Sequence, residues 1–136
     1  MRLLLDTHAL LWWLADDDQL GARARELIED PGNDVLVSVI SLWEVVVKVR
    51  VGNLVADIEE VADAIAREGF VLLGISTAHL AALAKLPMHH RDPFDHLLIA
   101  QAIEEDATLI SANRNTSRYP VRLVACADGP LSSDIR

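Results

Sequence analysis

The sequence predicts an α/β domain in which helices cover both faces of a central, mainly parallel sheet. Short and continuously apolar runs alternate along the chain with longer segments of helical spacing. Such runs are typical of strands buried on both faces, and the helices between them supply the crossovers that parallel strands need. The chain of 136 residues is 51% hydrophobic, which is the size and apolar content of one globular domain.

The strands are predicted from their apolar runs and from the turn signals beside them. Pro31, Gly32 and Asn33 introduce the second run, which is rich in valine. The five predicted strands are Arg2–Leu5, Val35–Ile40, Phe70–Ile75, Thr108–Ser111 and Val121–Val124.

The helices are predicted from their apolar faces and their capping residues. Thr7 is expected to cap the first helix, and Ser41 is expected to begin the third, which ends near Gly52. Pro93 suits the first turn of the last helix. The other predicted helices are Gly21–Asp30, Asp57–Glu68 and Thr77–Leu86, and the last one runs from Asp92 to about Ile103.

Domain organisation and location follow from the two ends of the chain and from its single cysteine. Residues 1–126 are expected to form the domain, and 127–136 a loosely ordered or partner-bound tail. Cys126 alone permits no intramolecular disulfide, which favours a reducing, cytoplasmic setting. Asp6 interrupts the apolar N-terminus too early for a signal peptide or a membrane span, so neither export nor a membrane partner is expected.

Charge limits the way in which this chain can bind a polyanion. The net charge is −9, which excludes non-specific binding of nucleic acid through bulk positive charge. A polyanion therefore needs a local site, and Arg114, Arg118 and Arg122 lie in a stretch without acidic residues.

Two acidic residues are singled out by their place in the predicted elements. Asp6 follows the first strand, where α/β sheets collect ligands, although aspartate is also common at such turns. Glu44 shares a helix face with Ile40 and Val47, so it is expected to face the sheet and to pair or bind a metal. The alternative is a surface pair with Lys48, one helical turn later.

A third acidic position lies at the start of the last predicted helix. Asp92 is interpreted first as its N-cap. Asp95 shares a face with Leu98 and Ile99, so its carboxylate is expected to point toward the core. Asp6, Glu44 and Asp95 together offer the hard oxygen ligands that Mg²⁺ or Mn²⁺ prefers, and such a site would hydrolyse a phosphodiester. Arg114 and Arg118 are candidates for contacts to the phosphates.

Three motifs in this order resemble the PIN-domain ribonucleases, most closely the VapC-like toxins of type II toxin–antitoxin pairs. They are LLDTHALLWWL, SLWEVVVK and HRDPFDHLLIAQA, and the resemblance spans Leu3 to Val124. It implies a three-layer α/β/α sandwich in which Asp6, Glu44 and Asp95 are catalytic and bind Mg²⁺ or Mn²⁺ to cleave RNA. It also implies a cognate antitoxin as partner and a homodimer, for which apolar surface on the early helices would suffice.

The fourth acidic position of the family departs from its pattern. The segment TLISANRNTSRYPV carries Asn113 where the family has an aspartate. An amide oxygen can bind a hard cation, but it supplies no charge and cannot act as a base. Asp92 and Asn113 are therefore auxiliary candidates, and the alternative function is a catalytically weak module that binds RNA or a partner.

Other features admit a second interpretation. Trp12, Trp13 and Trp43 are candidates for stacking on bases, although tryptophans on apolar helices more often fill a core or a dimer contact. A phosphoacceptor receiver domain fits poorly, because the first strand ends in a single acid. A haloacid-dehalogenase-like phosphatase would need a second aspartate at the position of His8.

Overall fold

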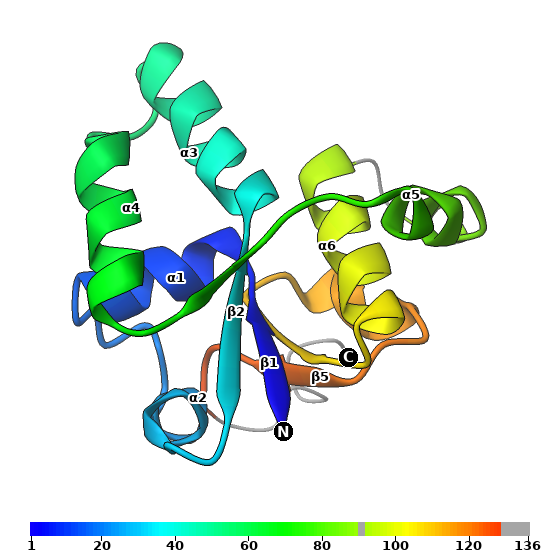
Figure 1. The fold of residues 1–136 in the computed structure, drawn as a ribbon, viewed down its shortest axis with the longest axis horizontal. Helices are drawn as coiled ribbons and strands as arrows, with labels where there is room; N and C mark the ends of the chain where they lie inside the picture. The colour runs from blue at the N-terminus through cyan, green and yellow to red at the C-terminus, as the bar shows by residue number, and fades with distance from the viewer. Residues whose placement is uncertain (90–91, 129–136) are drawn as a thin grey trace.

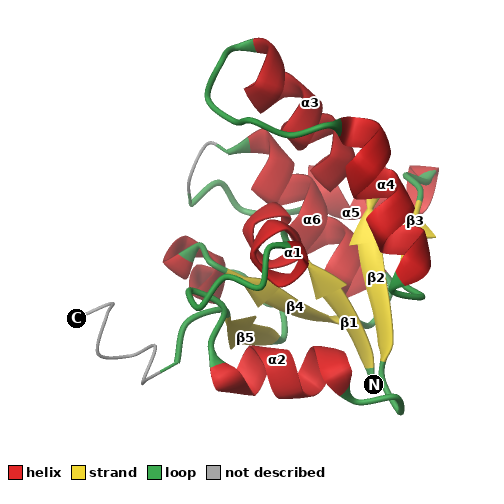
Figure 2. Ribbon diagram, turned by 90° about the vertical axis from the view of Figure 1, so that its left-hand side faces the viewer, coloured by secondary structure: helices red, strands yellow, loops and turns green. Residues whose placement is uncertain are grey.

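The computed structural model describes residues 1–89 and 92–128, without the side chain of Arg114. Within this part, five strands form one parallel sheet, as the sequence predicts, and their order is β3-β2-β1-β4-β5 (Figures 1 and 2). The strands are β1 (Arg2–Leu5), β2 (Asp34–Ser38), β3 (Val71–Leu73), β4 (Thr108–Ser111) and β5 (Leu123–Ala125).

Helices lie on both faces of the sheet and complete a three-layer α/β/α sandwich (Figures 1 and 2). They are α1 (Thr7–Leu14), α2 (Ala22–Glu29), α3 (Val39–Arg50), α4 (Ile58–Arg67), α5 (Thr77–Ala84) and α6 (Pro93–Glu104). A short 3-10 helix, η1 (Arg114–Arg118), follows β4. In the described part, no helix has both the length and the apolar character needed to cross a membrane.

Two hydrophobic cores separate the layers, because alternate residues of a strand point to opposite faces of the sheet. Leu3 and Leu5 of β1 pack into the core beneath α1, α2 and α4. Leu4, between them, packs into the core beneath α5 and α6. All three leucines are fully buried. Each contributes about 1.5–3 kcal/mol to the stability of the fold, and this is why β1 is apolar at every position after Arg2.

The order of the strands reverses at β1. The chain moves outward from β1 through β2 to β3, and α5 and α6 then carry it back to β4 on the other side of β1. The Asp6 N–H donates to the Ile110 carbonyl at 2.9 Å, so the ends of these two strands are tied together. In α/β sheets the carboxyl ends of the strands at such a reversal form the crevice where ligands bind.

The start of α3 corrects the prediction for this region. The Ser38 hydroxyl accepts from the Ile40 N–H at 3.1 Å and caps α3, so the helix begins at Val39 and not at Ser41. The predicted strand 35–40 therefore ran two residues past the end of β2, which also begins one residue earlier, at Asp34. Val39 and Ile40 are apolar and β-branched, so sequence pattern alone assigned them to the strand.

The C-terminal segment reaches the start of α2. Gly21 supplies no capping side chain there, and Asp128 caps this end instead, accepting from the Ala22 N–H at 2.8 Å and the Arg23 N–H at 3.3 Å. A Cβ at position 21 would lie 2.5 Å from the Asp128 carboxyl carbon, so the cap requires glycine. These hydrogen bonds lower the pKa of Asp128. Residues 129–136 of the predicted tail lie outside the described residues.

Candidate active site

Asp6 lies at the carboxyl end of β1 in the centre of the sheet. Its Oδ1 accepts from the Ala9 N–H and its Oδ2 from the Ala112 N–H, each at 2.8 Å. Asp6 is therefore the N-cap of α1 and also joins the end of β1 to the segment after β4. The side chain is buried, and burial raises its pKa, although both backbone hydrogen bonds act to lower it.

Thr7 is not the cap that the sequence predicted, because Asp6 holds that place and Thr7 is the first residue of α1. The Thr7 hydroxyl oxygen lies 2.6 Å from Glu44 Oε1 and 3.1 Å from Ser41 Oγ. All three side chains are buried. An ionised carboxylate can only accept, so Thr7 donates to Glu44 and links α1 to α3.

Glu44 combines both alternatives that the sequence left open. Its side chain is only 7% exposed and faces the interior, where Ile40 and Val45 of the same helix are also buried. Its Oε2 also lies 3.0 Å from the Lys48 ammonium, one helical turn later. The Lys48 pair therefore compensates part of the cost of burying this carboxylate.

Asp92 and Asp95 lie at the N-terminus of α6. Asp92 Oδ1 accepts from the Phe94 N–H at 3.0 Å and from the Asp95 N–H at 3.2 Å, so the predicted capping role of Asp92 is confirmed. Pro93 occupies the first turn, as predicted. The cap fixes the direction in which Asp95 leaves the helix, toward the end of β4.

Asn113 follows β4 and contacts Asp95 directly. Its amide nitrogen donates to Asp95 Oδ2 at 2.6 Å, while its amide oxygen accepts from the Asn115 N–H at 2.9 Å and caps η1. The capping bond determines which end of the amide faces the acids. The sequence suggested the Asn113 oxygen as a cation ligand, but in this conformation the nitrogen points to Asp95.

The carboxylates interact as one cluster, which we call the acid cluster: Asp6, Glu44, Asp92 and Asp95. Burial raises the pKa of Asp95 most strongly, the hydrogen bond from Asn113 opposes it, and the charges of the other three acids add to it. The net result is a pKa of about 7. The structure thus brings Asp6, Glu44 and Asp95 to one place, from three separate elements.

The donor chemistry of the acid cluster fits a divalent cation. Its oxygens are hard ligands, and burial raises the pKa of both Asp6 and Asp95, so ionising them here is costly unless a positive charge is added. No three His, Cys, Asp or Glu side chains of the described residues are already arranged as a metal site. Mg²⁺ needs no such set, since proteins usually bind it through one or two carboxylates while it keeps several waters.

The basic residues predicted to contact phosphate lie on η1 and beyond it. Arg118 is exposed in the last turn of η1. The side chain of Arg114 lies outside the described residues. Arg122, from the same acid-free stretch, is already paired with Asp106 at 2.7 Å. Arg118 is therefore the exposed arginine of this stretch whose side chain makes no ion pair with another described side chain.

Hydroxyl groups around the acid cluster are the part of the site that sequence reasoning missed. Thr7 and Ser41 surround Glu44. Ser111 accepts from the Asn113 N–H at 3.0 Å and lowers the pKa of Asp6. The sequence contained a signal for these hydroxyl groups, because Thr7 directly follows Asp6 and Ser111 ends β4, the strand beside β1.

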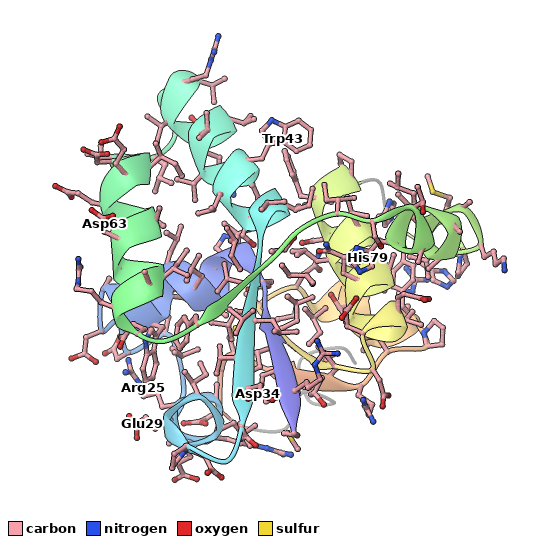
Figure 3. The ribbon with its side chains drawn as sticks, in the orientation of Figure 1. Arg25, Glu29, Asp34, Trp43, Asp63 and His79 are labelled. Atoms are coloured by element: carbon pink, nitrogen blue, oxygen red, sulfur yellow. The ribbon has the colours of Figure 1, made fainter. Side chains whose placement is uncertain are left out.

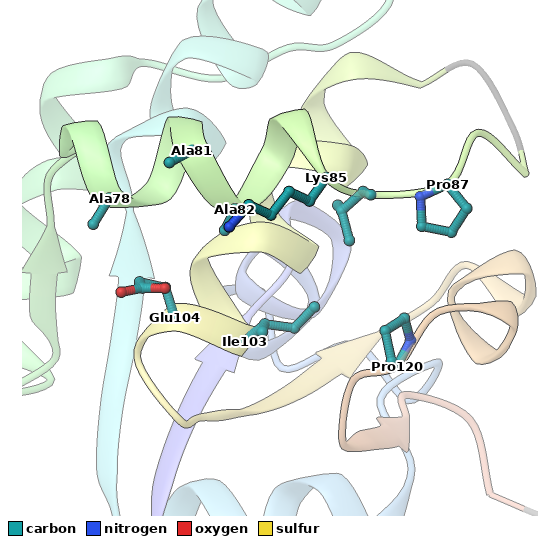
Figure 4. Close-up of a pocket in the computed structure, with 9 residues that line it drawn as sticks. Ala78, Ala81, Ala82, Lys85, Pro87, Ile103, Glu104 and Pro120 are labelled. Carbon is teal, nitrogen blue, oxygen red and sulfur yellow. The ribbon is translucent and has the colours of Figure 1, made fainter.

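One cavity in the described part of the structure lies away from the acid cluster. It has a volume of about 450 Å³ and lies between α5 and the C-terminal part of α6 (Figure 4). Alanines and prolines dominate its wall, with Lys85 and Glu104 at the edge. No residue of the acid cluster lines it, so the cavity does not define the active site.

The PIN domain family model matches residues 3–121, which is most of the chain. The chain belongs to the PIN-domain family. The resemblance seen in the three sequence motifs is thereby confirmed, together with the predicted sandwich. No curated protein matches this PIN domain.

Several solved structures share the fold of this PIN domain. VapBC2 from Rickettsia felis, bound to a DNA fragment from its promoter, is 20% identical with a TM-score of 0.73, covering 92% of this chain and 98% of its own. DNA-bound VapBC from Salmonella typhimurium is 14% identical with a TM-score of 0.67, covering 93% of this chain and 99% of its own. VapBC-1 from nontypeable Haemophilus influenzae is 16% identical with a TM-score of 0.62, covering 92% and 98%.

Proposed function

We propose that this PIN domain is a divalent-metal-dependent endoribonuclease and acts in the cytoplasm as the toxin of a toxin–antitoxin pair. One observation carries the proposal: four acids meet where the strand order reverses, and burial raises the pKa of Asp6 and Asp95 among them. Gathering carboxyl groups in such a place is costly for folding, so their presence favours a function that needs them. Membership of the PIN-domain family supports nuclease chemistry in particular.

The cation would be held by Asp6 and Asp95, with Glu44 beside them. When bound, Mg²⁺ or Mn²⁺ supplies a positive charge that polarises a phosphoryl oxygen and makes a water molecule a better nucleophile. Asp6 is well suited to a fixed role, because two backbone N–H groups hold its two oxygens. Asp95 titrates near neutral pH in the metal-free protein, so it can hold or release a proton there.

The neighbouring side chains hold these acids in place. Thr7 and Lys48 each hold one oxygen of Glu44, and Asn113 donates to one oxygen of Asp95. Arg118 and Arg114 are proposed to contact phosphates of the RNA on either side of the scissile bond. Because the chain as a whole is strongly acidic, these local contacts and the cation must outweigh the repulsion of the substrate.

An antitoxin and a second copy of the chain are the proposed partners. The VapBC complexes that share this fold support the antitoxin, and the acid cluster suits a basic segment. For the expected homodimer, α1 offers only part of its apolar surface, because Trp12, Trp13 and Leu14 are partly buried against the first core. More exposed apolar side chains lie on the edge strand β3, at Val71 and Leu72.

The test of the nuclease is cleavage of a panel of folded RNAs by the antitoxin-free protein with Mg²⁺, Mn²⁺ or EDTA. Asp95→Asn, purified identically, is the matched variant, since it removes the charge and keeps the shape. We expect metal-dependent cleavage that the variant lacks. Equal cleavage by both proteins, or cleavage in EDTA, would contradict the proposal.

A catalytically weak binding module is the second candidate function, and Asn113 favours it. This residue supplies no charge to the acid cluster and occupies an oxygen of Asp95. A well-folded protein that binds RNA or its partner but cleaves nothing with either cation would support this function. The same experiment therefore separates the two candidates.

A further inference from the structure

Trp43 is unusually exposed for a tryptophan beside buried acids. Its exposed fraction is 57%, whereas Glu44, the next residue, is almost fully buried. Trp43 belongs to neither hydrophobic core. Figure 3 shows it projecting from α3 on the side that faces α6.

Phe94 holds Trp43 from the opposite helix. The ring centroids lie 4.9 Å apart with an interplanar angle of 65°, an edge-to-face contact. Phe94 itself is firmly placed, because it packs against the second core and its N–H donates to Asp92 at 3.0 Å. An edge-to-face contact covers at most one face of Trp43, so a flat aromatic surface stays open to solvent.

This aromatic pair lies beside the acid cluster on both helices. Trp43 precedes Glu44 on α3, and Phe94 precedes Asp95 on α6. The Trp43–Phe94 ring contact and the electrostatic interaction of Glu44 with Asp95 both bridge α3 and α6, so the two pairs share one interface between these helices. The other tryptophans differ: Trp13, for example, packs on Phe70 and donates its indole N–H to Glu68 at 2.8 Å.

We propose that Trp43, supported by Phe94, is a stacking platform for an unpaired nucleobase next to the phosphate held at the acid cluster. The inference rests on the proposed function, which places a phosphate there. A base is joined to its phosphate through one sugar, so a neighbouring aromatic surface is within its reach. The platform makes single-stranded RNA, or a loop with splayed bases, the substrate class.

The charge of the chain strengthens this assignment. With a net charge of −9, the protein gains little affinity for RNA from electrostatics. Stacking on an aromatic ring needs no positive charge and contributes about 1–3 kcal/mol per base. Bases inside a duplex are already stacked on each other, so only unpaired bases can use the platform.

The test uses short single-stranded RNAs that carry 2-aminopurine at one position at a time. Stacking quenches the fluorescence of this base. Binding is measured in Ca²⁺ and in EDTA, without turnover, for the wild type, Trp43→Ala and Trp43→Phe, with Trp13→Phe as the control. Circular dichroism verifies that each variant is folded.

We expect quenching at one position in the wild type and in Trp13→Phe. Trp43→Ala should lose the quenching and bind about 5- to 150-fold more weakly, as the loss of one stacked base requires. Trp43→Phe should retain part of the quenching and part of the affinity for RNA. A duplex of the same sequence should show neither the quenching nor the weaker binding by Trp43→Ala.

Unchanged binding and quenching in Trp43→Ala would overturn the platform, as would absence of RNA binding by the wild type. Loss of antitoxin binding or of dimerisation by Trp43→Ala, with RNA binding unchanged, would assign the surface to a protein partner and also overturn it. The proposed function would fail by a different result. If the wild type quenches the fluorescence of bound RNA but does not cleave RNA in Mg²⁺ or Mn²⁺, the stacking platform is supported and the nuclease activity is contradicted.

Discussion

β1 and α6 both run between two polar regions of the molecule. The pKa of the carboxyl groups is raised in one region and lowered in the other. At one end, Asp6 follows β1 and Asp95 lies in the first turn of α6, and burial raises the pKa of both. At the other end, Arg2 begins β1 and Glu105 follows α6, and the pKa of Glu105 is lowered. The same two elements thus carry an acid cluster with excess charge and a cluster that is neutralised.

The partners of each carboxylate explain the difference. Glu105 Oε2 lies 2.8 Å from His79 Nε2, and its Oε1 lies 3.1 Å from the Arg2 guanidinium. His79 Nδ1 accepts from the Ser76 N–H at 3.0 Å, so Nε2 carries the proton and donates to Glu105. The fold can therefore supply a carboxylate with hydrogen-bond donors and a positive charge, as it does for Glu105. Asp6 and Asp95 have no positively charged partner of this kind among the described side chains, and this difference motivates the proposal of a bound cation at the acid cluster.

A matched pair of Glu→Gln substitutions provides the largest expected contrast between the two regions. Glu44→Gln should lower metal-dependent RNA cleavage at least about 100-fold, because it removes a charge from the acid cluster. Glu105→Gln should leave the cleavage rate close to that of the wild type. Single-turnover kinetics measure both. Similar losses in the two variants would mean that the rate reports stability and not the site.

Substitutions of Glu105 should instead change the stability of the fold. Glu105→Ala leaves the buried His79 N–H without its acceptor, so we expect a loss of about 1–3 kcal/mol in the free energy of unfolding. Glu105→Gln should lose less, because its amide oxygen can still accept from His79. Urea unfolding in EDTA measures this. An Ala variant as stable as the wild type would show that water replaces the carboxylate at no cost.

The pH dependence of stability should also distinguish the two regions. An acid whose pKa is raised in the folded state stabilises the fold when protonated, and that stability is lost as pH rises toward about 7 for Asp95. Glu105 has a lowered pKa, so its contribution is lost only when pH falls below its ordinary range. From pH 5.5 to 8 in EDTA, the Tm of the wild type should therefore fall about 3–6 °C more than that of Asp95→Asn. Calorimetry measures this, and parallel curves would contradict it.

Asn113→Asp offers the smallest and most specific change. An aspartate keeps the oxygen that caps η1, but it replaces the donor to Asp95 with a fifth acidic group beside the four of the acid cluster. We expect lower stability in EDTA and a two- to fivefold lower Mg²⁺ concentration for half-maximal stabilisation, about the effect of one added exposed charge. Thermal shifts across a Mg²⁺ titration measure it. A higher Mg²⁺ requirement would show that the amide of Asn113 helps to hold the cation.

Much of the fold could be predicted because the strands and helices carry strong local patterns. β1, at Arg2–Leu5, is an unbroken apolar run that ends at a polar residue, and Asp92 with Pro93 predicts the start of α6. Boundaries were less accurate where two signals compete. Val39 and Ile40 look like strand residues but belong to α3, because the Ser38 hydroxyl is available to cap the helix.

The sequence predicted only part of the candidate site. The acids Asp6, Glu44 and Asp95 could be chosen from their positions in the predicted elements. The roles of Thr7 and Asn113 could not, because each depends on a contact with a residue far along the chain. Thr7 donates to Glu44 across α1 and α3, and the direction of the Asn113 amide follows from its cap on η1.

By itself, the sequence determined the elements of this PIN domain, the residues at their ends and the acidic character of the site. These depend on local spacing and on side-chain chemistry, which neighbouring residues largely set. Only the tertiary structure decided that burial and the charges of Asp6, Glu44 and Asp92 raise the pKa of Asp95, while hydrogen bonds from His79 and Arg2 lower that of Glu105. That outcome depends on burial and on distances between separate elements, and these arise only when the strands pair and the helices pack on the sheet.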